Sequence, residues 1–269
     1  MKALDTTPPA KQDAGLARWQ RQVAFAPLGL AGQRALSAAR ALVVGLGGLG
    51  SWSAELLARA GVGMLRLADD DKVELTNIHR QGLYDEANAA ASPLKVAAAA
   101  ARLKALNSRL RVEPVAVRVD KDNIEALADG MDLILDGTDN FATRFLINDF
   151  AVKTDRPWVF AGVIGAEAQT MTIVPGRTAC LRCVLDGPPP PCTEKTCGNF
   201  GVLGPAVAAA AAFQACEAVK ILSGRGDQIS PYLVKFNLWD NTMQRLQTGK
   251  AGGQGCRCCG QREFEYLEP

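Results

Sequence analysis

Short apolar runs alternate with stretches of helical periodicity over the first 160 residues of the chain. Apolar runs of four or five residues predict buried strands, and apolar positions three and four apart predict helices. The pattern predicts strands at 41–44, 64–68, 110–118, 132–136 and 158–161, and helices at 48–61, 92–107, 123–128 and 141–153. Strands that alternate with helices in this way are typical of a parallel, doubly wound sheet.

The pattern changes after Gly162. Residues 169–174 alternate as in an antiparallel strand, and late strands are predicted at 232–238 and 242–247. We therefore expect an α/β fold with a doubly wound, Rossmann-like, mostly parallel sheet and an antiparallel C-terminal extension. Residues 1–13 are rich in Pro, Thr and charge, which predicts a flexible N-terminal arm, and 14–269 are expected to form a single domain.

Local signals add two features. Ser92-Pro93 predicts a helix N-cap followed by proline at the first helical position. The segment DGPPPPCTEKTCGNFG predicts a loop that crosses to a helix at 204–222. That helix is apolar, but Gln214, Glu217 and Lys220 interrupt it, so we expect a buried core helix and not a membrane span.

Charge and composition narrow the partners and the compartment. The net charge is +2, aromatic residues make up 6% of the chain and there is no basic block, so no nucleic-acid partner is expected. The N-terminal residues lack the apolar core of a signal peptide, and we expect a cytoplasmic location without a membrane. In that reducing compartment the eight cysteines are expected as metal ligands, catalytic thiols or core fillers, and not as disulfides.

A glycine loop lies between the first predicted strand and the first helix. Gly45, Gly47 and Gly50 match the G-x-G-x-x-G pattern, in which glycines allow backbone N–H groups to approach phosphate. Asp69 follows 19 residues after Gly50, at the end of the second strand, where an acid accepts a ribose hydroxyl. The loop therefore predicts a nucleotide site, but it does not separate NAD from ATP.

Polar residues after the next strands favour ATP. Asp71, Asn77, Arg80 and Lys95 follow the acid, and Asp139 follows the strand at 132–136. A dinucleotide site needs little cationic charge, whereas cations and a carboxylate-held Mg²⁺ stabilise a triphosphate that is being cleaved. Each of these residues alone is typical of a solvated loop, and it is their shared location at strand ends that favours ATP.

Six motifs occur in order along the chain: RWQRQ (18–22), GLGGLG, the acids followed by TNIHRQ, SPLKV, DGTDN and TCGNFGVLGP. With two cysteine pairs, this ordered set resembles the MoeB/ThiF family of ubiquitin-activating-enzyme-like adenylyltransferases over about residues 14–260. The resemblance implies a nucleotide-binding part at about 40–162. It also implies a part at about 163–260 that holds the crossover loop, a zinc site and the carrier-binding surface.

The resemblance implies a reaction, in which ATP adenylylates the C-terminal Gly-Gly carboxylate of a ubiquitin-like sulfur-carrier protein and releases pyrophosphate. It also implies a separate sulfur donor, such as a cysteine desulfurase or a rhodanese-type protein, and a homodimer. It assigns the nucleotide to the glycine loop (Gly45, Gly47, Gly48, Gly50) and to Asp71, ribose to Asp69, phosphates to Asn77, Arg80 and Lys95, and Mg²⁺ to Asp139. Arg21 would reach the phosphates of the neighbouring subunit. Cys197 matches a crossover-loop cysteine that transfers sulfur in some members, and Cys192 is a nearby rival.

Two C-x₂-C pairs, Cys180/Cys183 and Cys256/Cys259, are separated by 72 residues. Four thiolates suit a structural Zn²⁺, and the resemblance places a zinc here that would clip the C-terminal tail onto the domain. Cys258 leaves the register of the second pair open. Cys216, inside the 204–222 helix, is predicted to be a core filler.

Alternatives to this function remain at the level of the sequence. An NAD-dependent Rossmann oxidoreductase shares the glycine loop, and a family member could instead adenylylate a carboxylate carried on tRNA. A third alternative is a zinc-stabilised scaffold whose nucleotide site has decayed. The carrier could serve thiamine, molybdopterin or tRNA-thiolation pathways, between which the motifs do not choose.

Overall fold

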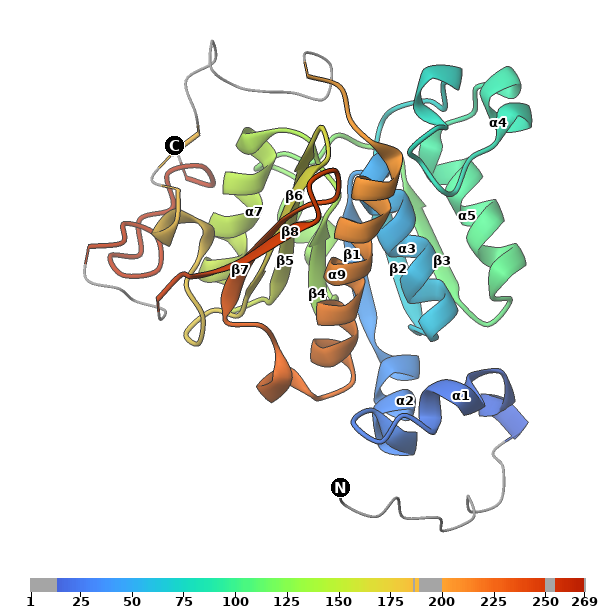
Figure 1. The fold of residues 1–269 in the computed structure, drawn as a ribbon, viewed down its shortest axis with the longest axis horizontal. Coiled ribbons are helices and arrows are strands. Elements are labelled where there is room, and N and C mark those ends of the chain that lie inside the picture. Colours follow the sequence, from blue (N-terminus) through green and yellow to red (C-terminus); the bar gives the residue numbers. More distant parts are fainter. Residues whose placement is uncertain (1–13, 186, 189–199, 250–254, 269) are drawn as a thin grey trace.

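The structure of the chain is a computed structural model that describes residues 14–185, 187–188, 200–249 and 255–268. Eight strands form one sheet in the order β3-β2-β1-β4-β5-β6-β7-β8 (Figure 1). The strands are β1 (Arg40–Val44), β2 (Met64–Ala68), β3 (Arg111–Val115), β4 (Leu133–Asp136), β5 (Trp158–Ile164), β6 (Glu167–Ile173), β7 (Tyr232–Asn237) and β8 (Thr242–Gln247). The predicted class is confirmed, because the strands from β3 to β5 pair in parallel and those from β5 to β8 pair antiparallel. The arm predicted at 1–13 lies outside the described residues.

Helices cover both faces of the sheet. The α-helices are α1 (Gln20–Val23), α2 (Gly29–Ala38), α3 (Gly48–Ala60), α4 (Glu86–Ala91), α5 (Lys95–Leu106), α6 (Ile124–Ala128), α7 (Phe141–Lys153) and α9 (Gly204–Leu222). Short 3₁₀ turns are η1 (Ala14–Trp19), η2 (Leu75–Asn77), η3 (Leu181–Cys183) and η4 (Gly226–Gln228). One core cluster joins the sheet to α3, α5 and α9, and a second joins it to α6 and α7 (Figure 1).

Strand β1 shows why the parallel half reads as continuous apolar runs. Ala41 and Val43 belong to the cluster under α3 and α5, while Leu42 and Val44 belong to the cluster under α7. Successive side chains of a strand point to opposite faces, so a strand with helices on both sides must be apolar at every position. The absence of alternation in the sequence is thus the signature of a buried central strand.

The bounds of several predicted strands differ from the structure. The strand predicted at 110–118 is shorter, since β3 covers Arg111–Val115. It is the edge strand and contains Pro114, which lacks the N–H that a further ladder bond would require. Strand β5 is longer than predicted and runs to Ile164, because β6 pairs with it up to Glu167.

The prediction of a helix N-cap at Ser92 is wrong. Ser92 is the C-cap of α4 in the left-handed conformation, with φ of 46°, and α5 begins later, at Lys95. Helix α4 is not among the predicted helices. It is stabilised by a capping box in which Asp85 and Asn88 exchange side-chain to backbone hydrogen bonds.

Helix α9 is, by length and composition, the one described helix that could cross a membrane, and half of its apolar window is buried inside the fold. Two polar side chains on α9 can be buried because they form hydrogen bonds in the interior. Gln214 and Glu217 both hydrogen-bond to neighbouring elements in the interior. The apolar character of α9 therefore serves the core between α3 and the sheet, as predicted.

Candidate functional site

A cavity of about 460 Å³ opens at the carboxyl ends of the parallel strands, where ligands bind in open α/β sheets. This volume lies in the range of small-molecule sites. Most of the residues predicted to bind nucleotide line it, namely Gly45, Gly47, Gly48, Asp69, Asp71, Asn77, Arg80, Lys95 and Asp139. Tertiary folding thus brings together residues that are up to 94 positions apart in the sequence, from Gly45 to Asp139.

The glycine loop is shaped by close backbone contacts. Gly45 has a φ of +81°, and a Cβ there would lie 2.9 Å from Gly137 O. A Cβ on Gly50 would lie 1.8 Å from Gly45 O, and Gly50 is not among the residues that line the cavity. Gly45 therefore shapes the loop, Gly47 and Gly48 face the cavity at the start of α3, and Gly50 lets α3 pack on the loop.

Asp69 braces the glycine loop from the end of β2. Its Oδ2 accepts a hydrogen bond from Leu46 N at 2.6 Å, and its Oδ1 accepts one from Asp71 N at 2.9 Å. Burial raises the pKa of the Asp69 carboxyl, while these amides and the charge of Lys95 act to lower it. The acid is thus held in place before any ligand arrives.

Lys95 and Asp71 both line the cavity and form an ion pair. Lys95 Nζ lies 2.7 Å from Asp71 Oδ2, and the lysine side chain is 6% exposed while the aspartate is 67% exposed. The ammonium group is therefore fixed by the fold, and its partner is open to solvent. A cation held in this way can meet an incoming anion with little rearrangement.

Arg80 and Asn77 lie together, as the predicted phosphate site requires. Arg80 Nη2 donates to Asn77 Oδ1 at 2.8 Å, and Arg80 Nη1 lies 3.0 Å from His79 Nε2. His79 is an exposed loop residue, as expected. The guanidinium is thus held by groups of its own loop.

Asp139 is exposed at the rim of the cavity, and its carboxylate makes no hydrogen bond or ion pair with the residues that the structure describes. The three acids at Asp69, Asp70 and Asp71 also lie close enough to hold a metal ion, with ligand oxygens within 4.8 Å of one another. Asp69 already accepts two amide hydrogen bonds and Asp71 is paired with Lys95, whereas Asp70 and Asp139 are exposed. Asp139 is therefore an open carboxylate of the cavity that could reach Mg²⁺.

Sequence reasoning missed the buried arginine that shapes the Asp139 loop. Arg144 Nε lies 3.1 Å from Asp136 Oδ2, and Arg144 Nη2 donates to Thr138 O at 2.6 Å. Burial raises the pKa of the Asp136 carboxyl, and the Arg144 charge opposes this shift. A charged residue near apolar neighbours such as Phe141, Phe145 and Leu146 in the first half of α7 was the available signal.

Gln214 of α9 was also missed as a positioning residue. Its Nε2 donates to Asp136 O at 2.8 Å and to Val159 O at 2.7 Å, and its Oε1 accepts from Ser53 Oγ at 2.7 Å. This amide ties α9, α3 and the two central strands together next to the cavity. Arg118, an exposed arginine that lines the cavity beyond β3, was not singled out either.

Besides Gly50, one described residue of the predicted site, Arg21, does not line the cavity. Arg21 is exposed on α1, which Figure 1 places at the opposite end of the sheet from the first turns of α3 and α5. Cys197 and its rival Cys192 lie outside the described residues. The role assigned to Arg21 therefore requires a second copy of the chain.

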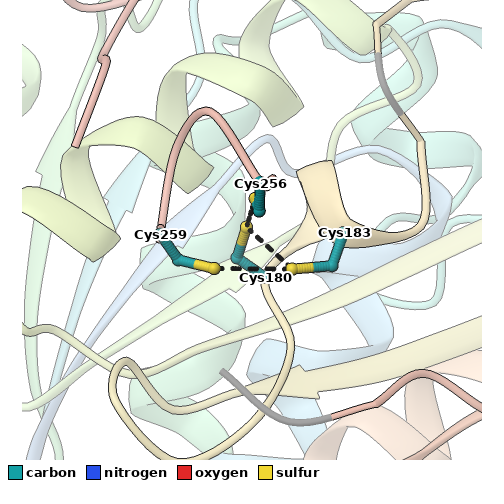
Figure 2. Close-up of side chains that lie close together, drawn as sticks. All are labelled: Cys180, Cys183, Cys256 and Cys259. Carbon is teal, nitrogen blue, oxygen red and sulfur yellow. Dashed lines mark hydrogen bonds between the residues drawn. The ribbon is translucent and has the colours of Figure 1, made fainter. Parts of the chain in front are cut away.

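Figure 2 shows the four predicted zinc ligands converging from two loops. Sulfur to sulfur distances are 3.8 Å for Cys180–Cys183, 3.6 Å for Cys180–Cys256 and 3.4 Å for Cys183–Cys259. Tetrahedral zinc with Zn–S bonds of about 2.3 Å requires sulfurs about 3.8 Å apart, so this donor set fits the metal. Hydrogen bonds from Cys183, Cys258 and Cys259 lower the pKa of the Cys180 thiol, and the hydrogen bond to Cys180 raises the pKa of the Cys183 thiol.

The structure resolves the register of the second pair. Cys256 and Cys259 belong to the cluster, while Cys258 is fully buried and accepts a hydrogen bond from Asn148 Nδ2. The prediction that Cys216 fills the core is wrong, because its side chain is exposed on α9. Residues 213 and 216 fall on the outer side of the helix, whereas Gln214 and Glu217 take the inner side.

The fold and the cavity define a nucleotide-binding α/β protein with a glycine loop and a cation-lined pocket. The model of the ThiF family matches residues 19–258, and the chain belongs to this family. It is 40% identical over 250 residues to the "Sulfur carrier protein ThiS adenylyltransferase" of Bacillus subtilis, which covers 93% of this chain and 73% of the relative. Adenylyltransferase is accordingly the enzyme class of this chain.

Other relatives are longer or more distant. "Adenylyltransferase and sulfurtransferase MOCS3" of Sus scrofa is 38% identical over 245 residues, covering 91% of this chain and only 53% of the relative. The chain thus spans about half the length of that protein. Among solved structures, E. coli MccB with ATP has a TM-score of 0.78 at 21% identity, covering 90% of this chain and 75% of the other. PaaA has a TM-score of 0.73 at 22% identity, with 92% and 78% covered, and both likenesses concern the fold alone.

Proposed function

We propose that the chain uses ATP and Mg²⁺ to adenylylate the C-terminal Gly-Gly carboxylate of a ubiquitin-like sulfur-carrier protein. The observation that carries the proposal is the cavity of a ThiF-family chain in which Arg80 and the buried Lys95 lie beside the glycine loop. A dinucleotide site has no need of two such cations, which is the reason to prefer ATP over NAD.

The proposed roles follow the geometry of the cavity. The backbone of the glycine loop and the N-terminus of α3 hold phosphate, and Asp69 accepts a ribose hydroxyl. Arg80, Asn77 and Lys95 contact the phosphates, and Asp71 keeps Lys95 in place through the 2.7 Å ion pair. Bound Mg²⁺ would neutralise phosphate charge, and the open carboxylate of Asp139 is the residue that would hold it.

The chemistry requires little more than positioning. The carboxylate of a protein C-terminus is ionised at neutral pH, so no general base has to generate the nucleophile. It attacks the α-phosphorus, and pyrophosphate leaves. Two anions must meet in this step, and the cations of the cavity reduce their repulsion.

The carrier tail has a route into the cavity from the antiparallel half. Besides the nucleotide residues, Gly162, Val163 and Glu167 of the β5–β6 hairpin and Val202 line the space. Val202 forms an isolated bridge with Gly165, so the chain after the crossover loop lies along this side of the cavity. We propose that the Gly-Gly tail enters here, because two glycines, which have no side chains, need the least space beside the glycine loop.

The relatives suggest the carrier without deciding the pathway. The Bacillus relative is named for ThiS, and its match covers more of both chains than that of the MOCS3 relative. We therefore propose a ThiS-like carrier first and a molybdopterin-type carrier second. A separate sulfur donor, a cytoplasmic location and the reactivity of Cys197 stay predictions.

The test is ATP–pyrophosphate exchange with a panel of purified carriers that end in Gly-Gly. Exchange should depend on one carrier and vanish when its terminal glycine is deleted. Each carrier without its tail is the matched control. Exchange with none of the carriers, together with retention of NAD but not ATP, would contradict the proposal and favour the oxidoreductase.

A further inference from the structure

The segments that carry both cysteine pairs pack against helix α7. The first pair is carried by the turn around η3, and the second by the C-terminal residues that follow Gly255. Neither segment is long enough to form a core of its own. Both cover the sheet face on which α7 lies, and their side chains belong to the same core cluster as Phe145 and Phe150 of that helix.

One side chain of α7 forms hydrogen bonds to both of the loops that carry the pairs. Asn148 is fully buried, its Oδ1 accepts a hydrogen bond from Leu181 N at 2.8 Å, and its Nδ2 donates to Cys258 Sγ at 3.3 Å. Leu181 lies between the two ligands of the first pair, and Cys258 lies between those of the second. A single carboxamide thus spans the two loops that supply the four sulfurs.

Neighbouring residues of α7 hold the rest of the C-terminal segment. Asp149 is fully buried, and its Oδ2 accepts a hydrogen bond from Tyr266 N at 2.9 Å. Arg262 Nη1 donates to Val152 O at 3.1 Å, near the end of the helix. The segment is therefore fastened along the second half of α7, and Asn148 is the fastening closest to the sulfurs.

We propose that Asn148 is the positioning residue of the zinc site. Its amide fixes the distance between the two cysteine pairs and holds Cys258 out of the ligand set. Without it, the second pair is free to bind through Cys256 and Cys258, or to separate from the first. The proposal goes beyond adenylyl transfer and rests on the zinc site inferred above.

The geometry explains why the sequence leaves this register open. C-R-C-C offers three thiols within four residues, and any two of them can reach a metal. A hydrogen-bond donor aimed at the middle thiol selects the outer two. Partners of this kind, which contact ligand loops and not the metal, typically alter metal affinity 10–100-fold.

The test compares variants of the full chain by zinc affinity, measured by competition with a chelator. Asn148→Asp retains the acceptor for Leu181 N but loses the donor to Cys258, so its zinc dissociation constant should rise about tenfold. Asn148→Ala loses both bonds and should raise it up to roughly 100-fold. Asn241→Asp makes the same change of charge at the exposed β7–β8 turn and should leave the affinity unchanged.

Cobalt(II) in place of zinc gives a second readout, because its spectrum reports the number of thiolate ligands. Cys258→Ala should retain the four-sulfur spectrum, while Cys259→Ala should lose it. If neither Asn148 variant folds, the Cys258→Ala spectrum decides alone, since a lost sulfur there would overturn the proposal. Wild-type zinc affinity in folded Asn148→Ala would overturn it as well.

If the wild-type chain binds no zinc, there is no zinc site and the proposal is overturned. The proposed function is tested separately, by carrier-dependent exchange.

Discussion

The nucleotide cavity and the cysteine cluster both lie against α7, the first beside its initial turn and the second beside its later turns. They differ in how their polar groups are satisfied. Asp71 is 67% exposed and Asp139 is exposed, whereas Cys180 is 1% exposed and the other three clustered cysteines, Cys183, Cys256 and Cys259, are half-buried. A site that exchanges ligands keeps charge open to solvent, and a site that holds a structural metal is closed by protein groups.

This difference predicts that damage to the two sites will have separate consequences. The open cavity should contribute to the reaction and little to folding, since most of its charged groups, such as Asp71, Arg80 and Asp139, are exposed or half-buried. The closed cluster contributes to stability, because it joins two segments far apart in the sequence. The experiments below test this separation, from the largest expected effect to the smallest.

Lys95→Ala should reduce carrier-dependent pyrophosphate exchange roughly 10³-fold, because it removes a fixed cation from the developing phosphate charge. The melting temperature should change little, since the Asp71 left behind is mostly exposed. Lys104→Ala, an exposed position on the same helix, is the matched control and should have normal exchange. Exchange near the wild-type rate in Lys95→Ala would break the assignment of the open site.

Mixing Arg21→Ala with Asp139→Ala should restore exchange to about a quarter of the wild-type rate. Half of the dimers would be mixed, and each would hold one intact site of two if Arg21 acts on the partner subunit. Each variant alone should be nearly inactive. A mixture that stays inactive, although mixed dimers are isolated from it, would place each complete site within one chain.

Removal of zinc by a chelator should release about one ion per chain and lower the melting temperature by roughly 5–10 °C. The loss follows from the release of the C-terminal segment from α7. Cys216→Ala, which changes an exposed cysteine outside the cluster, should melt as the wild type does. A metal-free protein with an unchanged melting temperature would show that the closed site does not stabilise the fold.

Glu113→Gln provides the baseline for an ion pair that belongs to neither site. Burial tends to raise the pKa of Glu113, but the Arg66 and Arg111 guanidinium groups hold it below its usual value of 4.5. A lowered carboxyl pKa stabilises the folded state above pH 4.5, and this contribution is lost as the pH falls through the folded pKa. The variant should lose about 0.2–1 kcal/mol of unfolding free energy at pH 7, and less on acidification.

Glu125→Gln, at an exposed position on α6, is the control for that measurement and should have no pH-dependent effect. Urea titrations at pH 7 and at pH 4 give both free energies. An equal loss at the two pH values would show that Glu113 acts through packing and not through its charge.

Much of the parallel half could be predicted from the chain alone. Two strands and one helix were predicted within a residue, namely 41–44, 64–68 and Phe141–Lys153. The strands could be predicted because burial on both faces of the sheet requires unbroken apolar runs. The N-cap assigned to Ser92 failed, since local preference for a cap did not foresee that Ser92 would end a helix formed by the capping box before it. Cys216 failed because Gln214 and Glu217, the polar side chains that a sequence pattern assigns to the outer face of a helix, turn inward on α9.

The amino-acid sequence by itself determined the strand and helix order, the glycine loop with its acid, and the four sulfurs that suit zinc. These features depend on residue type and spacing, which local chemistry restricts directly. Only the tertiary structure decided which acids are exposed to solvent and which accept hydrogen bonds from the backbone. It also decided that Gly50 serves packing, and that Cys258 lies outside the cluster of four sulfurs. Those outcomes depend on buried partners such as Arg144, Gln214 and Asn148, whose hydrogen bonds reach residues that the chain brings close only when it is folded.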